Sequence, residues 1–183
     1  MSDPIKPFKL HLGCGKRHIP GFFHIDQADF PHIDHRGWVD DLSLFEAGSV
    51  QLIYACHLLE HFERTRTVTV LREWLRVLQP GGIVRVAVPD FDAMCKVYQQ
   101  TGDLGLIIGP LYGRQDHPYN YHYTVFTEKT LSAVFKEAGF TTVRRWDWRT
   151  TEHAEIDDFS QAYIPHMDKD HGTLISLNLE GVK

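Results

Sequence analysis

Residues Phe8 to Gly15, FKLHLGCG, decide the fold of this chain, because a short apolar run stops abruptly there at Gly-x-Gly. An apolar run of this length is typical of a buried strand. Two nearly adjacent glycines let the backbone that follows turn tightly and approach a ligand. The stretch therefore predicts a strand and a close turn of the kind that begins nucleotide pockets, although plain turns also use Gly-x-Gly.

The rest of the chain alternates between the patterns of strands and helices. Residues Glu63 to Leu78 place apolar side chains on one helical face, and Thr127 begins a second such run that stops at Gly139. Phe91 to Gln100 suggest another helix, and Thr101 to Tyr123 predict an excursion over the sheet. Further strands are expected at Phe22–Ile25, Trp38–Val39, Val50–Cys56, Ile83–Val88, Thr141–Arg149 and Thr173–Leu179. This order predicts an α/β fold with a mostly parallel sheet.

The composition limits the classes of protein that fit. With 183 residues and 43% hydrophobic content, residues 1–183 are expected to form a single domain. A net charge of −5 with scattered basic residues argues against nucleic acid or an anionic membrane as a partner. No apolar run approaches the roughly 18 residues of a membrane span, and the start, MSDPIKPFK, has no signal-peptide core. Cys14, Cys56 and Cys95 show no CxxC spacing, so we expect a cytoplasmic protein in a reducing compartment.

Four features occur in order along the first half of the chain. They are LHLGCG, then Asp26 after the second strand, then Asp41-Leu42 after the third, and then a buried fourth strand followed by a helix and LQPGG. The ordered set resembles the class I S-adenosylmethionine (SAM) dependent methyltransferases, in particular the methyltransferase type 11 group. The resemblance implies a Rossmann-like sheet with helices on both faces, an enzyme, and SAM as its cofactor.

The resemblance also assigns cofactor contacts to the ends of the predicted strands, where ligands of open parallel sheets lie. Asp26 would accept hydrogen bonds from the ribose hydroxyls, because a carboxylate is purely an acceptor, and Asp41 would bind the adenine amino group. Cys56 and His57 would lie under the transferred methyl group. The positions that the resemblance places against SAM are Gly13, Cys14, Gly15, Asp26, Asp41, Leu42, Cys56 and His57.

One departure from the family lies between the first two strands. The family has a full helix there, whose N-terminus faces the carboxylate of the cofactor. In this chain only residues 16 to 25 separate the glycine turn from the acidic residue after the second strand. Pro20 and Gly21 deny this shortened crossover a helix. We predict that Lys16 or Arg17 replaces the lost helix dipole by pairing with the methionine carboxylate of SAM.

The stretch Gly113 to His122, GRQDHPYNYH, is the predicted acceptor site, because loops over the strand ends tend to carry function. SAM supplies an activated methyl group, so the protein has to hold an acceptor in line and remove its proton. A hydroxyl acceptor benefits from a general base, for which His122 and His117 are candidates, with Asp90 as an orienting or alternative base. Hydrogen-bonding groups on the loop favour a small polar, sugar-like acceptor, and an amine acceptor stays open. The residues expected to bind the acceptor are Tyr119, Asn120 and Tyr121.

Two alternative functions stay open from the sequence. The pentapeptide His57 to His61, HLLEH, matches H-x-x-E-H, in which two histidines on a helix share a zinc ion and a glutamate, here Glu60, activates water. Glu128 or Glu137 would be the third ligand of such a metallohydrolase. The motif follows directly on a buried strand, however, whereas a zinc site of this kind needs the whole pentapeptide within a helix, and the methyltransferase interpretation explains more of the chain. The second alternative is a domain that binds SAM without catalysis, since a fold does not guarantee chemistry.

Two features near the end of the chain have a structural interpretation. Residues Thr150 to Gly172 hold histidines and acidic residues without a known metal-ligand spacing, which favours a solvated acidic loop. Trp146 and Trp148 share one face of a predicted strand, which indicates packing or a contact in a homodimer.

Overall fold

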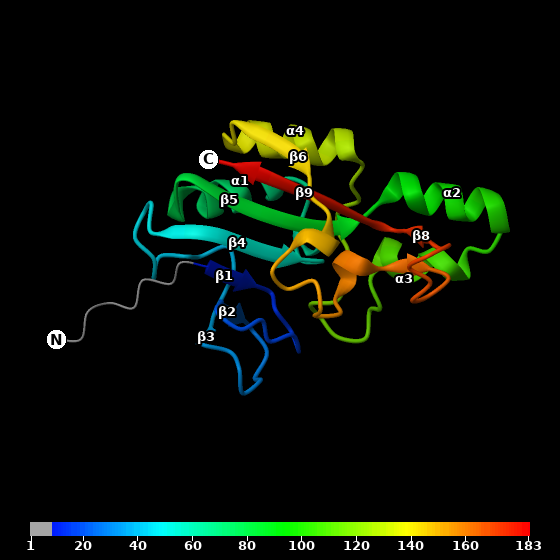
Figure 1. The fold of residues 1–183 in the computed structure, drawn as a ribbon, viewed down its shortest axis with the longest axis horizontal. Helices are drawn as coiled ribbons and strands as arrows, with labels where there is room; N and C mark the ends of the chain where they lie inside the picture. Colours follow the sequence, from blue (N-terminus) through cyan, green and yellow to red (C-terminus); the bar gives the residue numbers. More distant parts are fainter. Residues whose placement is uncertain (1–8) are drawn as a thin grey trace.

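The computed structural model describes residues 9–183, which are built around a seven-stranded sheet (Figure 1). Phe8, which begins the predicted first strand, lies outside the described residues. The strand order is β3-β2-β1-β4-β5-β9-β6; β9 runs antiparallel to both of its neighbours, and β1 to β5 pair in parallel. The strands are β1 Lys9–Leu12, β2 Phe23–Asp26, β3 His35–Arg36, β4 Val50–Cys56, β5 Leu78–Pro89, β6 Thr142–Arg145 and β9 Ser176–Val182. The predicted α/β fold with a mostly parallel sheet is confirmed.

The third strand differs from its prediction. It lies at His35–Arg36, and the expected strand Trp38–Val39 is wrong. The chain leaves the sheet at Gly37, whose amide donates to a carbonyl at the end of β2 at 3.1 Å. Val39 is buried in the core instead, and its carbonyl accepts a 2.7 Å hydrogen bond from Nε1 of Trp74. The apolar residues that suggest a strand therefore anchor a loop on a helix.

Helices α1 (Thr67–Val77) and α4 (Glu128–Ala138) pack side by side against one face of the sheet (Figure 1). Both helices follow the predicted periodicity. The predicted start at Thr127 is confirmed, because its side chain accepts from the amide of Thr130 and so caps α4. The strands contribute alternate apolar side chains to this face, as the two-residue period of a strand requires. The main hydrophobic core lies between the sheet and these two helices.

The opposite face of the sheet, which we call the polar face, buries several polar side chains. His11, His24 and Tyr54 lie on it and are at most 2% exposed. Residues 13–22, which connect β1 to β2, form turns and no helix, so the predicted short crossover is confirmed. The polar face is covered instead by residues 146–161, which we call the cover segment. A stretch from a distant part of the chain thus covers this face, and no helix between β1 and β2 does so.

The cover segment differs from the solvated loop that the sequence predicts. Its 3-10 helices are η2 Trp148–Thr150 and η3 Phe159–Gln161. The predicted strand Thr141–Arg149 is shorter than expected, because β6 ends before the segment begins. Trp146 packs 6.0 Å from the ring of Tyr54, and Trp148 joins the same apolar cluster. The two tryptophans therefore serve packing within the chain.

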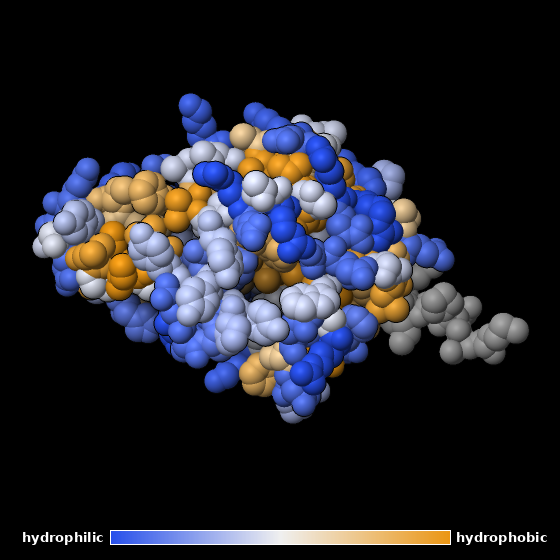
Figure 2. All heavy atoms as spheres, turned by 180° about the vertical axis from the view of Figure 1, so that it is seen from behind, coloured by the Kyte–Doolittle hydropathy of each residue, from blue (hydrophilic) through white to orange (hydrophobic). Residues whose placement is uncertain are grey.

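Helices α2 (Phe91–Thr101) and α3 (Gly105–Tyr112) extend beyond the carboxyl ends of β4 and β5 (Figure 1). They pack on each other and near a small two-stranded sheet of β7 (Tyr163–Ile164) and β8 (Thr173–Leu174). Helix α3 falls inside the predicted excursion Thr101–Tyr123, where no helix is expected. Apolar side chains are exposed at this end of the molecule, on the left of Figure 2, and include Leu104, Leu106 and Ile108. None of the helices among residues 9–183 is long and apolar enough to cross a membrane.

Candidate active site

The turn after β1 lies at the carboxyl edge of the sheet. Gly13 and Gly15 have φ angles of 61° and 50°, a backbone conformation that residues with a Cβ rarely adopt. The amide of Gly15 donates a 2.8 Å hydrogen bond to Oδ2 of Asp26, which joins the turn to the end of β2. A Cβ on Gly13 would lie 2.6 Å from Cδ1 of Leu58, so the turn also touches the segment after β4. Three of the predicted cofactor positions are thus brought together beside that segment.

The side chains around this turn differ in their surroundings. Cys14 is buried, and burial raises the pKa of its thiol to about 12, so the group stays protonated. Lys16 is exposed. Arg17 donates through Nε to the carbonyl of Asp157 at 3.1 Å, and its guanidinium lies 5.5 Å from the ring of Phe159. Arg17 therefore ties the turn to the cover segment, while Lys16 reaches into solvent.

The predicted adenine contacts lie beside an open hollow. Asp41 is exposed, and its Oδ1 accepts from the amide of Ser43 at 3.1 Å. The backbone of Leu42 is already engaged, because its amide donates to Glu73 and its carbonyl accepts from Arg76, both at 2.9 Å. A hollow of about 360 Å³ is lined by Trp38, Asp40, Asp41 and Arg66. Asp41 thus has room for a ligand beside it, and Trp38 adds an aromatic wall.

The chain bends sharply where β4 ends at Cys56. His57 has a φ of 50°, a strained conformation for this residue and one that clusters at functional sites. Its Nε2 lies 3.3 Å from Oγ of Ser176, whose hydroxyl donates to Oδ1 of Asn178 at 2.9 Å. Because that hydroxyl proton is already used, Nε2 of His57 carries the ring proton and Nδ1 keeps a lone pair. This Nδ1 lies 3.3 Å from Oε1 of Glu60.

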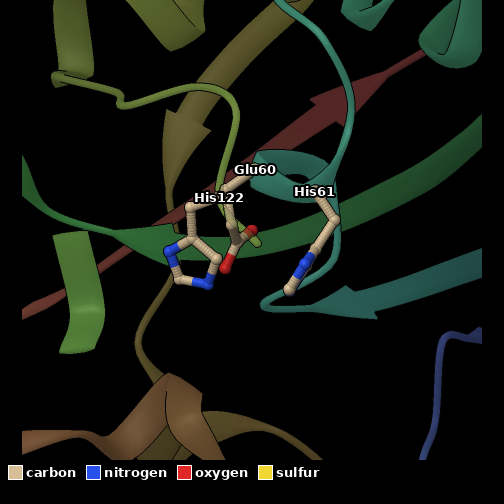
Figure 3. Close-up of side chains that lie close together, drawn as sticks. All are labelled: Glu60, His61 and His122. Carbon is tan, nitrogen blue, oxygen red and sulfur yellow. The ribbon is translucent and has the colours of Figure 1, made fainter. Parts of the chain in front are cut away.

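Glu60, His61 and His122 form a cluster in which the possible ligand atoms all lie within 4.8 Å of one another (Figure 3). The first two side chains come from η1 (Leu59–His61), and the third comes from the loop after α3. The close-up shows the carboxylate of Glu60 between the two imidazole rings. Glu60 is 0% exposed, and neither of its oxygens has a hydrogen-bond partner among residues 9–183.

Backbone carbonyls orient both imidazoles of the cluster. Nδ1 of His61 lies 3.1 Å from the carbonyl of Tyr121, and Nδ1 of His122 lies 2.8 Å from the carbonyl of Pro110. A carbonyl only accepts, so each Nδ1 carries a proton, and Nε2 of each neutral ring is left as a bare lone pair. The cluster therefore presents two unprotonated nitrogens and one unpartnered carboxyl group.

The loop that carries His122 is held on η1 by its backbone. The amides of Tyr123 and Thr124 donate to the carbonyl of Glu60 at 2.9 and 3.2 Å. The hydroxyl of Thr124 donates to the carbonyl of Phe62 at 2.8 Å. These contacts join segments that are about sixty positions apart in the sequence and fix the place of His122 beside η1.

Burial controls the charge of the cluster. It raises the pKa of Glu60 to about 8, and it lowers the pKa of His57 to about 3 and that of His61 to about 4. Burial also lowers the pKa of His122. The imidazoles are therefore neutral at physiological pH, and without a cation beside it the carboxyl group of Glu60 is largely protonated there.

Two of the predicted catalytic residues lie outside the cluster. The side chain of His117 is 58% exposed at the tip of its loop, with Nε2 3.8 Å from Oδ1 of Asp116. Asp90 caps α2, because its Oδ1 accepts from the amides of Asp92 and Ala93. The structure thus brings only His122, of the three predicted bases, to the cluster.

The predicted acceptor-binding residues line the outer part of the same loop. The ring of Tyr119 lies 6.0 Å from the ring of Trp38, so the loop tip reaches the wall of the hollow. Asn120 donates to Oδ1 of Asp116 at 2.6 Å, which stabilises the tip. Tyr121 contributes its carbonyl to His61, and its side chain is exposed.

The zinc site expected from H-x-x-E-H is not formed by the described residues. His57 lies before η1, and its Nε2 is directed to Ser176, so the two histidines of the motif do not share one helix. Glu128 pairs with Arg145 on α4, and Glu137 lies near the end of the same helix. The cluster therefore joins Glu60 and His61 to His122, a combination that the motif does not include.

A family model described as a methyltransferase domain matches residues 10–145 of the chain. The chain belongs to this methyltransferase family. It is an enzyme that depends on SAM. Neither of the two alternative functions, the metallohydrolase and the non-catalytic domain, therefore applies to it. No curated protein matches the sequence significantly.

Solved structures of methyltransferases share the fold. A SAM-dependent methyltransferase from Archaeoglobus fulgidus has a TM-score of 0.60 at 11% identity, covering 96% of this chain and 85% of its own. The 1,6-didemethyltoxoflavin-N1-methyltransferase of Burkholderia thailandensis, solved with S-adenosylhomocysteine, has a TM-score of 0.58 at 15% identity, covering 96% and 70%. A SAM-dependent methyltransferase from Methanosarcina mazei has a TM-score of 0.56 at 15% identity, covering 96% and 91%. The Rossmann-like fold expected from the resemblance is confirmed.

Proposed function

We propose that this methyltransferase transfers the methyl group of SAM to a hydroxyl of a small polar, sugar-like acceptor held at the Glu60–His61–His122 cluster. The observation that carries the proposal is the orientation of His122. Its Nδ1 donates to the carbonyl of Pro110 at 2.8 Å, which leaves Nε2 free to accept a proton. Burial lowers the pKa of this imidazole, so the ring is neutral at pH 7, as a base has to be.

The proposed SAM site runs along the carboxyl ends of β1, β2 and β4. Gly13 to Gly15 pass under the methionine and ribose, Asp26 accepts from the ribose hydroxyls, and Asp41 binds adenine in the adjoining hollow. His57 lies under the methyl group. The close approach of Gly13 to Leu58 supports this arrangement, because it sets the cofactor turn against the segment that leads directly into the cluster.

The chemical step is a displacement in which the acceptor oxygen attacks the methyl carbon of SAM. The O–C bond forms as the C–S bond breaks, and the electron pair of that bond passes to sulfur. The sulfonium becomes the neutral thioether of S-adenosylhomocysteine. The hydroxyl proton leaves to Nε2 of His122, either directly or through a water molecule. His117, which is exposed, and Asp90, which caps a helix, are assigned supporting roles at most.

Hydroxyl rather than amine transfer fits a site that retains a base. An amine acceptor needs little help to lose its proton, whereas a sugar hydroxyl is a poor nucleophile until its proton is removed. Tyr119 and Tyr121, both exposed on the loop, offer the aromatic faces and hydroxyls that bind sugars. Asn120 adds amide groups to the same loop.

The same account assigns the enzyme to the cytoplasm, with a small-molecule acceptor as its partner and a homodimer as its assembly. Support for a reducing compartment comes from Cys14, Cys56 and Cys95, which are free thiols. Support for a dimer comes from the apolar side chains exposed on α3 (Figure 2). Analytical ultracentrifugation measures this assembly directly, and a monomer at micromolar concentration contradicts it.

Replacing His122 with Ala tests the base. We expect His122→Ala to lower kcat by about 100-fold or more, because a positioned general base contributes on the order of 10² to 10⁴. The Kd for SAM, measured by isothermal titration calorimetry, should not change. The matched control is His171→Ala, since the side chain of His171 is 88% exposed and pairs with Asp168, which is not part of the cluster. An unchanged kcat in His122→Ala removes this residue from the mechanism.

A further inference from the structure

We infer that Glu60, His61 and His122 bind a divalent transition-metal ion, of the Zn²⁺ class, and that the acceptor hydroxyl coordinates this ion. Binding of the ion follows from the cluster alone. Only the second half of the inference, coordination of the acceptor, rests on the proposed function. From the sequence, zinc stays open only through H-x-x-E-H, which pairs His57 with His61 and does not include His122.

The first argument is the surroundings of Glu60. Its side chain is 0% exposed, yet neither oxygen has a hydrogen-bond partner among residues 9–183. Buried carboxylates in proteins are almost always paired, hydrogen-bonded or bound to metal, because an orphaned one costs several kcal/mol. His57 does not supply the missing donor, since the proton of its ring is on Nε2, toward Ser176. The lone pair of Nδ1 instead faces Oε1 of Glu60 at 3.3 Å. His57 therefore leaves Glu60 without a donor, and an ion held by Glu60, His61 and His122 would supply the missing partner.

The second argument is the orientation of the two imidazoles. Metal-bound histidines usually donate their other ring N–H to a carbonyl or carboxylate, which fixes the tautomer that leaves the ligand nitrogen bare. Both rings of the cluster have this arrangement, His61 through the carbonyl of Tyr121 and His122 through the carbonyl of Pro110. The ring of His61, on η1, and the ring of His122, on the loop after α3, thus lie on either side of the carboxyl group of Glu60 (Figure 3).

The third argument is the donor set. Two imidazole nitrogens and one carboxylate oxygen are the three protein ligands of many catalytic zinc sites, whose fourth position stays open for water or substrate. The possible ligand atoms lie within 4.8 Å of one another, compared with roughly 3.4 Å around an ion with bonds of about 2.1 Å. The separation of up to 4.8 Å is wider than this, so the ligand atoms have to draw together when an ion binds.

An ion at this position explains how the hydroxyl is activated. A divalent cation lowers the pKa of a bound hydroxyl or water by several units, so the acceptor loses its proton near neutral pH. The ion would replace the direct proton transfer to His122 in the proposed function, because Nε2 of His122 is then a ligand and the hydroxyl proton leaves to water. The neighbouring groups allow this role, because among residues 9–183 no lysine or arginine pairs with Glu60, whose carboxyl group lies within ion-pair distance of His57 alone.

The test measures ion binding on the full chain, without a histidine tag and after treatment with a chelator. Zn²⁺ alone is titrated by calorimetry, and Co²⁺ alone is followed through its visible absorption bands. We expect one ion per chain in the wild type. Glu60→Gln and His122→Ala should each weaken binding by more than the roughly 10- to 100-fold that loss of an outer contact costs. SAM binding by each variant shows that it is folded.

His171→Ala is the matched control, because His171 and Asp168 form a histidine–carboxylate pair on the surface, 3.4 Å apart, outside the cluster. We expect its ion binding to equal that of the wild type. The inference is overturned if the wild type binds no stoichiometric ion, or if Glu60→Gln and His122→Ala bind the ion as tightly as His171→Ala does.

Turnover with hydroxyl acceptors separates this inference from the proposed function. Loss of turnover on chelation and its return with Zn²⁺ support both. Stoichiometric ion binding without methylation of any hydroxyl acceptor leaves the metal site standing and overturns hydroxyl transfer. Turnover that is unchanged in protein shown to be free of metal overturns the role of the ion while the proposed function stands.

Discussion

Two buried carboxyl groups, those of Asp158 and Glu60, differ in their hydrogen-bond partners. Asp158, in the cover segment, accepts from the hydroxyl of Tyr54 at 2.6 Å through Oδ2. Its Oδ1 accepts from the amide of Ser160 at 2.9 Å and from the hydroxyl of the same residue at 2.6 Å. Glu60 accepts nothing from residues 9–183. The fold supplies donors to both oxygens of Asp158, whereas neither oxygen of Glu60 has a donor among the described residues.

A continuous line of contacts joins the two carboxylates. The carbonyl of one serine accepts from an asparagine amide at 3.0 Å, and that asparagine in turn accepts from a second serine at 2.9 Å. The line runs from Asp158 through Ser160, Asn178 and Ser176 to His57, which faces Glu60. These hydrogen bonds on the polar face thus orient the ring of His57, which lies beside Glu60.

The largest expected effect compares the same change at both carboxylates. Asp158→Asn should lower the free energy of unfolding by about 1.5 to 3 kcal/mol, because three hydrogen bonds to a charged acceptor are weakened. Glu60→Gln, in protein free of metal, should cost less than about 1 kcal/mol or stabilise, since it removes a carboxyl group without partners. Urea unfolding of both variants measures the two values. Equal losses would break the comparison.

A buried histidine on the polar face, His11, should make the stability of the protein depend on pH. Burial, together with neighbouring histidines such as His24 and His153, lowers the pKa of His11 to about 3 in the folded chain. The unfolded chain, with an ordinary histidine pKa near 6.5, therefore binds more protons between these values. The contribution of neutral His11 to the free energy of unfolding should be fully present above about pH 7. It should fall as pH decreases, by up to about 1.4 kcal/mol per pH unit.

His11→Phe removes this titration while keeping an aromatic ring among Phe22, Tyr54 and His24. We expect the variant to lose less stability than the wild type between about pH 7 and pH 5, as measured by urea unfolding at both values. Parallel losses in the two proteins would show that His11 is not the group that titrates.

The smallest expected effect concerns Lys16 and Arg17, in the turn after β1. Replacing both Lys16 and Arg17 with Ala should raise the Kd for SAM by about five- to tenfold, as expected for one or two exposed charge pairs. The free energy of unfolding should fall by about 1 kcal/mol, because Arg17 also contacts Asp157 and Phe159 in the cover segment. Arg145→Ala, which breaks an exposed pair with Glu128 on α4, is the control. An unchanged Kd for SAM would show that these cations do not replace the missing helix.

Local signals predicted the parts of the fold that depend on neighbouring residues. FKLHLGCG gave the first strand and its turn, Thr127 marked the start of α4, and Pro20 and Gly21 excluded a helix in the short crossover. The prediction of a strand at Trp38–Val39 was wrong, because an apolar pair that anchors a loop on α1 has the same local pattern as a short strand.

The cluster was only half visible in the sequence. Glu60 and His61 stand out in H-x-x-E-H, and His122 stands out in its loop, but no spacing rule joins them. They meet because the carbonyls of Pro110 and Tyr121 and the amide of Tyr123 hold the loop in place. Backbone groups are the same in every residue, so contacts of this kind leave no pattern of side chains to detect. The acidic composition of the cover segment likewise does not show that it packs on the polar face.

The most direct measurement of the central claim is anomalous X-ray scattering at the zinc edge from crystals of the chain grown with Zn²⁺. The account predicts a strong peak within bonding distance of Oε1 or Oε2 of Glu60 and of Nε2 of His61 and His122. Crystals that show no peak there, with zinc absent or bound only to exposed side chains such as His171, would contradict it.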